Sequence, residues 1–311
     1  MFVSLLFLII GFIMLVKGAD WFVDGAAGIA TRMGIPQLII GLTIVALGTS
    51  APEAAVSISA AARGSADITI GNIIGSNAIN TLVILGLASV IVPIAVAKST
   101  LKYEMPFMIA VTALILGLGI DGNITRIDGV VLSIAFLSYL AYMFICARKN
   151  SDEDGAEDPQ TKRRPVWQLL LFTVIGLVMI VFGSDFAVDG ATGIAQRLGM
   201  SERMIGLTVV ALGTSLPELF TSVSAARKGN ADIAVGNIVG SNIFNILFVV
   251  GISSLIVPVP FAENFVIDSL FVLASAILLF GCCIPKKKLT RGGGIALLVF
   301  YVLYFVYLLT K

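Results

Sequence analysis

The sequence predicts an all-α membrane protein in which ten transmembrane helices form two five-helix repeats of inverted topology. Hydrophobic residues make up 58% of the 311 residues and charged residues only 13%. Soluble globular proteins are less hydrophobic and more highly charged than this. Apolar runs of about 20 residues, long enough to cross the hydrocarbon core, recur along the chain. The chain also repeats itself at one fixed offset, and this repeat divides the helices into two sets.

Ten apolar runs define the predicted helices. The first run lacks the basic start and small-residue cleavage site of a signal peptide, so we expect it to be retained as a helix. The predicted bounds are 2–30, 36–62, 68–93, 103–120, 126–147, 165–194, 201–227, 232–257, 264–283 and 290–309.

Lysine and arginine are unevenly shared between the loops. With an external N-terminus, fourteen of them lie in cytoplasmic loops and five outside, with Lys17 left uncounted. Cytoplasmic loops of membrane proteins carry such an excess, so we expect a multi-pass protein of the cell membrane with both termini outside. The net charge of +1, without a basic stripe, points to no nucleic-acid partner. The lipid bilayer is the expected environment, and no protein partner is required.

An internal repeat dominates the chain. Gly48–Glu53 returns as Gly213–Glu218, 165 residues later, and Asn80 returns as Asn245 at the same offset. Each copy contains five predicted helices. Because five is odd, the second copy must enter the membrane from the opposite side, which is the inverted repeat of secondary transporters.

The repeat divides the chain into three parts. Residues 1–147 form the first five-helix repeat, 148–165 a charged cytoplasmic linker, and 166–311 the second, inverted repeat. The acidic run in the linker lacks the alternating ligands and central glycine of an EF-hand loop. We therefore interpret it as a solvated hinge.

The second helix of each repeat contains a proline-interrupted motif. Pro52 and Pro217 lack a backbone donor and disfavour helix at the preceding residue. We expect helices 2, 3, 7 and 8 to be discontinuous at the centre of the protein. A break at membrane depth is tolerated where it is buried or lines a wet cavity, and the carbonyls of Ala46 and Ala211 then become candidate ligands.

Glu53 and Glu218 follow these prolines directly. A charged residue at the bilayer centre costs roughly 2.5–3.5 kcal/mol on insertion scales. A structural kink accounts for the prolines and the nearby hydroxyls, but not for two glutamates without a cation in their own helices. We therefore predict a cation site at the two glutamates. The motif hydroxyls are further candidates: Thr49, Ser50, Thr214 and Ser215.

The third helix of each repeat carries a second polar face, because its polar residues recur every four positions. The predicted ligands on it are Ser76, Asn80, Ser241 and Asn245. Asn72 and Asn237 share the face and serve either as ligands or as helix-to-helix contacts. Asn77 and Asn242 point off the face and are expected to hold the broken helix.

All these candidate ligands are oxygens, which suit hard cations such as Ca²⁺ rather than soft metals. Two ionised glutamates are neutralised by one Ca²⁺ or by two Na⁺, so a site that holds either load in turn is a simple basis for exchange. The chain has no histidine, which excludes Ser–His hydrolysis and the usual zinc ligand. Its three cysteines are interpreted as packing residues, and no cofactor is expected.

These motifs resemble a known family. Residues 48–53 (GTSAPE) with 71–77 (GNIIGSN), and 213–218 (GTSLPE) with 236–242 (GNIVGSN), look like the two alpha repeats of the calcium/cation antiporter superfamily, and most of all like its compact prokaryotic sodium/calcium exchangers. The resemblance covers nearly the whole chain. It implies ten helices, one central Ca²⁺ position with several Na⁺ positions, and alternating access in which helices 1 and 6 slide past the others.

The resemblance also assigns roles by motif position. It implies that Glu53 and Glu218 bridge the central ions, and that the other candidate oxygens complete the site. Asn80 and Asn245 are neutral where some relatives carry aspartate, which leaves the Na⁺ stoichiometry, K⁺ dependence and any proton pathway open. Ala51 replaces a leucine common in the first motif, and the long regulatory loop of animal exchangers is replaced by the short linker.

The expected function is therefore antiport of Na⁺ against Ca²⁺, not enzymatic catalysis. A Ca²⁺/H⁺ antiporter, in which the buried glutamates carry protons, is the alternative, and the many hydroxyl and amide oxygens favour sodium. A cation channel is less consistent with inverted repeats. An intramembrane protease would need an aspartyl pair or a Ser–His pair. The buried acids here are glutamates and the chain has no histidine, so this alternative is disfavoured.

Overall fold

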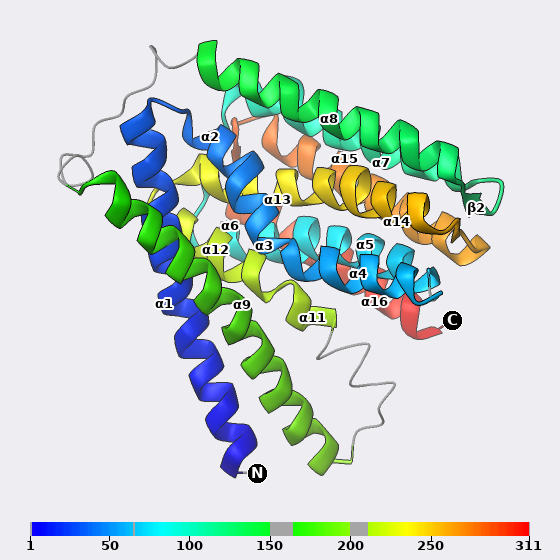
Figure 1. Ribbon diagram of the computed structural model, residues 1–311, viewed down its shortest axis with the longest axis horizontal. Coiled ribbons are helices and arrows are strands. Elements are labelled where there is room, and N and C mark those ends of the chain that lie inside the picture. The colour runs from blue at the N-terminus through cyan, green and yellow to red at the C-terminus, as the bar shows by residue number, and fades with distance from the viewer. Residues whose placement is uncertain (1, 65, 150–163, 200–210, 311) are drawn as a thin grey trace.

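The computed structural model describes residues 2–64, 66–149, 164–199 and 211–310, and within them the protein is all-α apart from four two-residue strands (Figure 1). Eight described helices are long and apolar enough to cross a membrane, and a bent pair makes a ninth. The predicted membrane fold is confirmed at this level. Part of the predicted helix 201–227 lies outside the described residues.

The first half contains the elements that correspond to the first five predicted helices. Three short π-helical turns, labelled η, interrupt the α-helical segments. The elements are α1 (Phe2–Met33), α2 (Gln37–Ile40), η1 (Gly41–Val45), α3 (Ala46–Thr49), α4 (Ala51–Ala62), α5 (Asp67–Ala78), η2 (Ile79–Ile84), α6 (Leu85–Ile91), β1 (Ile94–Ala95), η3 (Thr100–Glu104), α7 (Met105–Gly119), β2 (Asn123–Ile124) and α8 (Arg126–Lys149).

The described elements of the second half correspond to the last five predicted helices. Its elements are α9 (Val166–Arg197), α11 (Ala211–Thr214), α12 (Leu216–Arg227), α13 (Ala231–Phe244), η6 (Asn245–Val250), α14 (Gly251–Ile256), β3 (Val259–Pro260), α15 (Glu263–Cys283), β4 (Lys288–Leu289) and α16 (Arg291–Thr310). Predicted and observed helix ends agree within a few residues.

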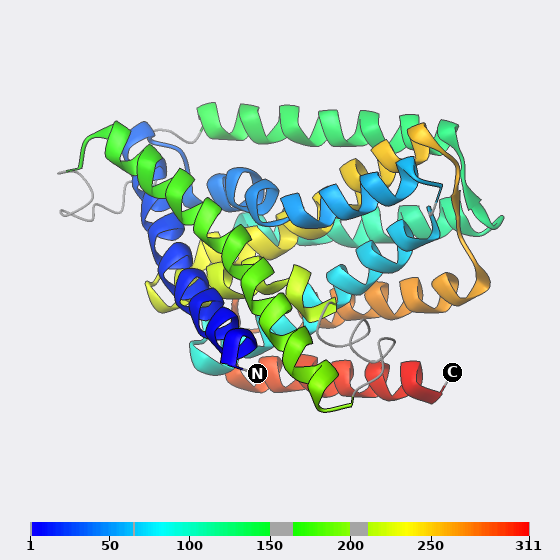
Figure 2. The same ribbon diagram turned by 60° about the horizontal axis from the view of Figure 1, so that its bottom comes forward.

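The long helices α1 and α9 form a close antiparallel pair at one side of the molecule (Figures 1 and 2). Glycines at seven-residue intervals allow the two backbones to touch, since a Cβ on Gly18 would lie 2.9 Å from the carbonyl oxygen of Gly176. Small residues of this kind permit close helix packing in membranes. The interface glycines are Gly11, Gly18 and Gly25 on α1 and Gly176, Gly183 and Gly190 on α9.

The second and third helical segments of opposite halves pack against each other at the centre. α13 lies against α2, η1 and α3, and α12 lies against η2 and α6. Every residue of α13 from Ile233 to Phe244 is buried, and a Cβ on Gly240 would meet the Leu42 carbonyl oxygen at 2.6 Å. The apolar surroundings and close backbone contact leave these segments little freedom of position.

The predicted break in the second helix is confirmed. α3 ends at Thr49, α4 begins at Ala51, and the two parts are bent by 50°. The third helix of each half differs from the prediction of a discontinuous helix. It stays a single span with a widened π-helical turn, η2 or η6, because no proline interrupts it and every residue keeps its backbone donor.

Two short strand pairs connect loops that are distant in the sequence. β1 pairs with β4, and β2 pairs with β3, both antiparallel. These pairs place the loop after α6 beside the loop before α16, and the loop after α7 beside the loop after α14. The two strand pairs therefore link helix-connecting loops of the first half to helix-connecting loops of the second half.

Candidate cation site

The two glutamates predicted to form the site are completely buried. Glu53 lies in the first turn of α4 and Glu218 in the first turn of α12, and both are 0% exposed. Their carboxylates are near enough to interact electrostatically. The two halves of the chain thus bring their equivalent acids together at the centre of the fold.

The prolines explain how each glutamate is placed. Pro52 and Pro217 occupy the start of α4 and α12, where a missing N–H costs little because the first turn of a helix has no acceptor for it. The glutamate that follows then lies at the helix N-terminus, where the helix dipole favours negative charge. This local electrostatic effect offsets part of the cost of burying the carboxylates.

The two carboxylates have different surroundings. The Ser50 hydroxyl donates to Glu218 Oε1 across the two halves at 2.8 Å, and the Thr49 and Ser241 hydroxyls also face Glu218. Neither oxygen of Glu53 has a hydrogen-bond partner among the described residues, and the same holds for the Ser215 hydroxyl. The pair is therefore asymmetric although its sequence motifs are nearly identical.

Several of the predicted site residues carry buried oxygens without a hydrogen-bond partner among the described residues. Buried polar atoms normally have partners, so these oxygens are candidate ligands for a cation. In the described parts of the chain, no group of three or more His, Cys, Asp or Glu side chains could hold a metal ion, so a cation here would be held by two carboxylates and neutral oxygens. On the predicted site residues the unpartnered atoms are Glu53 Oε1 and Oε2, Glu218 Oε2, Ser215 Oγ, Ser241 Oγ, Asn80 Oδ1 and Asn245 Oδ1.

Four asparagines join the third helices of the two halves. The Asn80 side chain donates to Asn242 Oδ1 and that of Asn245 donates to Asn77 Oδ1, each at 3.1 Å. Asn77 also donates to the Asn242 backbone carbonyl at 3.1 Å. The prediction that Asn77 and Asn242 hold the broken helix was wrong, because their partners lie on the opposite third helix. The sequence showed their repetition but not which helix they would face.

Asn72 and Asn237 hold the broken helices instead. Asn72 donates to Ser57 Oγ and Asn237 donates to Ser222 Oγ, both at 2.9 Å. Asn237 Oδ1 also accepts from Thr49 Oγ1 at 2.9 Å. Of the two roles considered from the sequence, the structure supports helix-to-helix contact. Ser76 is buried on the same helix as Asn72.

The backbone carbonyls at the helix breaks differ from the prediction that Ala46 and Ala211 would be freed as ligands. Ala46 O accepts the Ser50 backbone N–H at 3.0 Å and lies 3.4 Å from the Thr49 hydroxyl, so the break does not release it completely. The carbonyl that loses its helical donor to Pro217 is that of Gly213, and it accepts the Ser184 hydroxyl of α9 at 2.6 Å. Ser184 was missed from the sequence, since the matching position in the first half is Ala19. Thr214 and the backbone of Ala211 lie in α11.

Comparison with known proteins identifies the family. The family model described as "Sodium/calcium exchanger protein" matches residues 3–145 and 168–310, which is most of the chain. The chain belongs to the sodium/calcium exchanger family.

Relatives with function names agree with this membership. The exchanger-family chain is 40% identical to the putative antiporter CaxA of Alkalimonas amylolytica, with 98% of each chain covered. It is 32% identical to the sodium/calcium exchanger MaX1 of Methanosarcina acetivorans, again over 98% of each. These relatives are transporters, so this family member is a membrane transporter and not an enzyme.

A solved structure shows the same fold. The sodium-calcium exchanger NCX_Mj, in a form soaked with Na⁺ and Sr²⁺, matches this exchanger-family chain with a TM-score of 0.85 at 34% identity and 98% coverage of both chains. The resemblance to compact prokaryotic exchangers noted from the motifs is therefore confirmed. The fold and the class of cation/Ca²⁺ antiporter follow from these matches.

Proposed function

We propose that this chain exchanges Na⁺ for Ca²⁺ across the cell membrane by alternating access, at a central site formed by Glu53 and Glu218. The observation that carries the proposal is the meeting of these two fully buried carboxylates from opposite halves. Three of their four oxygens have no hydrogen-bond partner among the described residues. Two negative charges in that setting require cations, and one Ca²⁺ or two Na⁺ balance them.

The proposed ligand set extends from the carboxylates to neutral oxygens. Ca²⁺ takes six to eight oxygens in flexible geometry, and hydroxyl, amide and carbonyl oxygens supply them here without adding charge. The hydrogen bond from Ser50 to Glu218 supports the inclusion of Ser50, and the Thr49 and Ser241 hydroxyls lie on the side of the same carboxylate. The full proposed set is Glu53, Glu218, Thr49, Thr214, Ser50, Ser215, Ser76, Ser241, Asn80 and Asn245, with the carbonyls of Ala46 and Ala211.

Contacts between loops support ten spans in two inverted halves, 1–147 and 166–311, joined by the cytoplasmic linker 148–165. In a ten-helix topology, β1 and β4 fall on one side of the membrane and β2 and β3 on the other, as their pairing requires. The ion pair between Lys228 and Asp24, 2.7 Å apart, joins two segments assigned to the inner side. Arg126 donates to the Ile256 carbonyl at 3.1 Å on the outer side. The antiparallel packing of α1 and α9 agrees with halves of opposite orientation.

The arrangement also supports a moving part. α1 and α9 touch each other over most of their length through glycine backbones, so they form one body that borders the broken helices through α12 and α3. We propose that this pair slides past the remaining helices and exposes the central site to each side in turn. Both termini then lie outside the cell.

Reconstituted flux tests the proposal. Glu53→Gln and Glu218→Gln keep the size of the side chain and remove the charge, so each should abolish Na⁺-dependent ⁴⁵Ca²⁺ uptake into proteoliposomes. Glu263→Gln, a change at an exposed glutamate at the start of α15, is the matched control and should transport normally. Uptake that persists in both central variants would exclude the site.

The Ca²⁺/H⁺ antiporter is the rival, because a buried carboxylate can carry a proton in place of sodium. Uptake driven by a Na⁺ gradient at equal pH is compared with uptake driven by a pH gradient without Na⁺. Sodium coupling predicts uptake only with the Na⁺ gradient. Repeating that measurement with and without K⁺ shows whether potassium is needed. Flux without any counter-ion gradient would indicate a channel.

A further inference from the structure

A third buried carboxylate lies outside the candidate cation site. Glu104 is the last residue of η3, within the span Thr100–Gly119, and is 4% exposed. Its Oε2 has no hydrogen-bond partner among the described residues. An ionisable side chain within a membrane span is costly and is a functional-site candidate by default.

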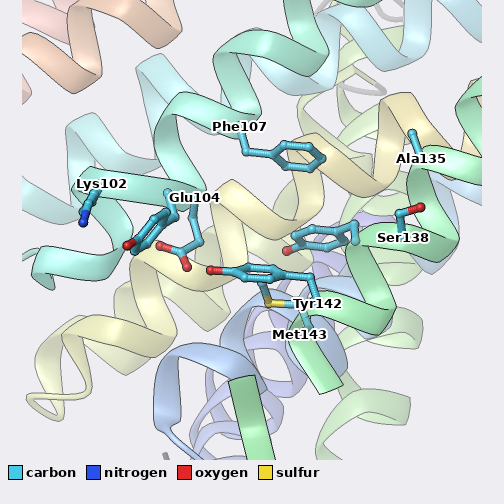
Figure 3. Close-up of a pocket in the computed structure, with 9 residues that line it drawn as sticks. Lys102, Glu104, Phe107, Ala135, Ser138, Tyr142 and Met143 are labelled. Carbon is cyan, nitrogen blue, oxygen red and sulfur yellow. The ribbon is translucent and has the colours of Figure 1, made fainter. Parts of the chain in front are cut away.

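Glu104 lines a pocket of about 590 Å³ between η3, the start of α7 and the last turns of α8. Figure 3 shows the Glu104 carboxylate and the Tyr142 hydroxyl directed toward each other. The rings of Phe107 and Tyr139 stack at 5.5 Å in the same wall. Tyr103 is 49% and Tyr142 40% exposed, so the pocket reaches the outer surface of the helices, where lipid lies.

The charges around the pocket favour a ligand with separated positive and negative groups. Glu104 lines one end of the pocket and its Oε2 has no hydrogen-bond partner among the described residues, so this end attracts a cation. Aromatic faces add to that attraction. Lys102 lies at the edge of the pocket, 5.0 Å from the Tyr103 ring centre, and can pair with an anion. Figure 3 shows Lys102 directed away from the Glu104 carboxylate.

We propose that this pocket binds a phospholipid whose headgroup ends in a primary ammonium, as that of phosphatidylethanolamine does. The ammonium donates to Glu104, the phosphate two carbons away pairs with Lys102, and an acyl chain follows the apolar wall of Phe107 and Ala135. The unpartnered carboxylate oxygen distinguishes among headgroups. A primary ammonium offers N–H donors and charge together, phosphatidylcholine offers charge without a donor, and phosphatidylglycerol offers donors without positive charge.

Native mass spectrometry of the full chain, titrated with each of these three lipids, tests the proposal. Phosphatidylethanolamine should bind about tenfold more tightly than the other two, as expected for one charge-assisted hydrogen bond. Glu104→Gln should reduce this preference to within about twofold. Glu263→Gln, which changes an exposed glutamate outside the pocket, should leave the preference unchanged.

A second variant tests the pocket in case Glu104→Gln does not fold. Tyr142→Leu keeps Glu104 and changes only a half-exposed wall, so it should fold normally and weaken phosphatidylethanolamine binding several-fold. Trp167→Leu, at an exposed aromatic residue of α9, is its control. Equal binding of the three lipids, or an unchanged preference in Glu104→Gln, would overturn the proposal. Glu104-dependent Ca²⁺ binding in lipid-free micelles, with no preference among lipids, would assign the pocket to an inorganic cation instead.

Discussion

The side-chain nitrogen of Asn80 donates to Oδ1 of Asn242 at 3.1 Å. The equivalent bond in the other half joins Asn245 to Asn77 at the same distance. An amide whose nitrogen is committed turns its oxygen the other way, and Oδ1 of both Asn80 and Asn245 lacks a partner among the described residues. Asn77 and Asn242 therefore fix the orientation of the two amides, and in the proposed site each Oδ1 is the acceptor that faces the cation.

Removing one orienting partner should weaken ion binding without removing a ligand. Asn242→Ala lets the Asn80 amide rotate, so the apparent KM for Ca²⁺ should rise about tenfold, as for other residues that orient metal ligands. The maximal rate should change less than KM. Ser89→Ala, which removes a buried hydroxyl that donates to the Gly86 carbonyl of its own helix at 3.0 Å, is the control. An unchanged KM in Asn242→Ala would refute the orienting role.

The asymmetry between the two glutamates predicts unequal effects of matched serine changes. Ser50 donates to Glu218, whereas the Ser215 hydroxyl has no partner among the described residues. Ser50→Ala should lower the free energy of unfolding by about 1.5–3 kcal/mol, the value of a hydrogen bond to a charged group. Ser215→Ala should be nearly neutral. The comparison is made by thermal unfolding in ion-free detergent solution, and equal shifts would show that the two halves are equivalent in solution.

Ser184 should stabilise the break in the second half. Its hydroxyl satisfies the Gly213 carbonyl that Pro217 leaves without a helical donor, so Ser184→Ala should cost about 1–3 kcal/mol of stability. Ser138→Ala changes an exposed hydroxyl bonded within α8 and should cost much less. Denaturation curves of the two variants check the difference, and similar curves would contradict it.

The glycine contacts between α1 and α9 predict a steric effect. Gly183→Ala places a methyl group 3.0 Å from the Gly11 carbonyl oxygen and the Leu15 nitrogen, so the helices must separate and both stability and transport should fall. Gly281→Ala, in α15, meets no atom within 4 Å and should be neutral or stabilising by up to about 1 kcal/mol through helix propensity. Thermal stability and ⁴⁵Ca²⁺ flux are measured for both. A Gly183→Ala protein as active as Gly281→Ala would argue against tight packing during transport.

Surface labelling tests the inverted topology. Asp121→Cys and Lys286→Cys are introduced at exposed positions in a chain whose natural cysteines, Cys146, Cys282 and Cys283, are replaced by serine. A membrane-impermeant maleimide applied to intact cells should label position 121 and leave position 286 unlabelled until the cells are opened. Labelling of both from outside would rule out the proposed arrangement.

Much of the fold followed from the sequence because lipid imposes strong rules on a chain. A segment in hydrocarbon must satisfy its own backbone, so apolar runs of sufficient length predict helices and prolines predict their breaks. The bend at Ser50 and the burial of both glutamates were predictable for this reason. The third helices were predicted as discontinuous but contain π turns, since polar residues alone do not remove backbone donors.

The sequence by itself determined the membrane class, the helix positions, the doubled motif and the candidate oxygen ligands, because these depend on composition and local spacing. Only the tertiary structure decided which residues at matching positions of the two repeats make the same contacts. The Ser50 hydroxyl donates to Glu218 while the Ser215 hydroxyl has no hydrogen-bond partner among the described residues. The asparagine pairs cross between halves, and Glu104 lies beside an aromatic pocket outside the two motifs. These relationships depend on how two copies of one pattern pack against each other, and a linear pattern contains no information about the distance or facing of side chains that are 165 residues apart.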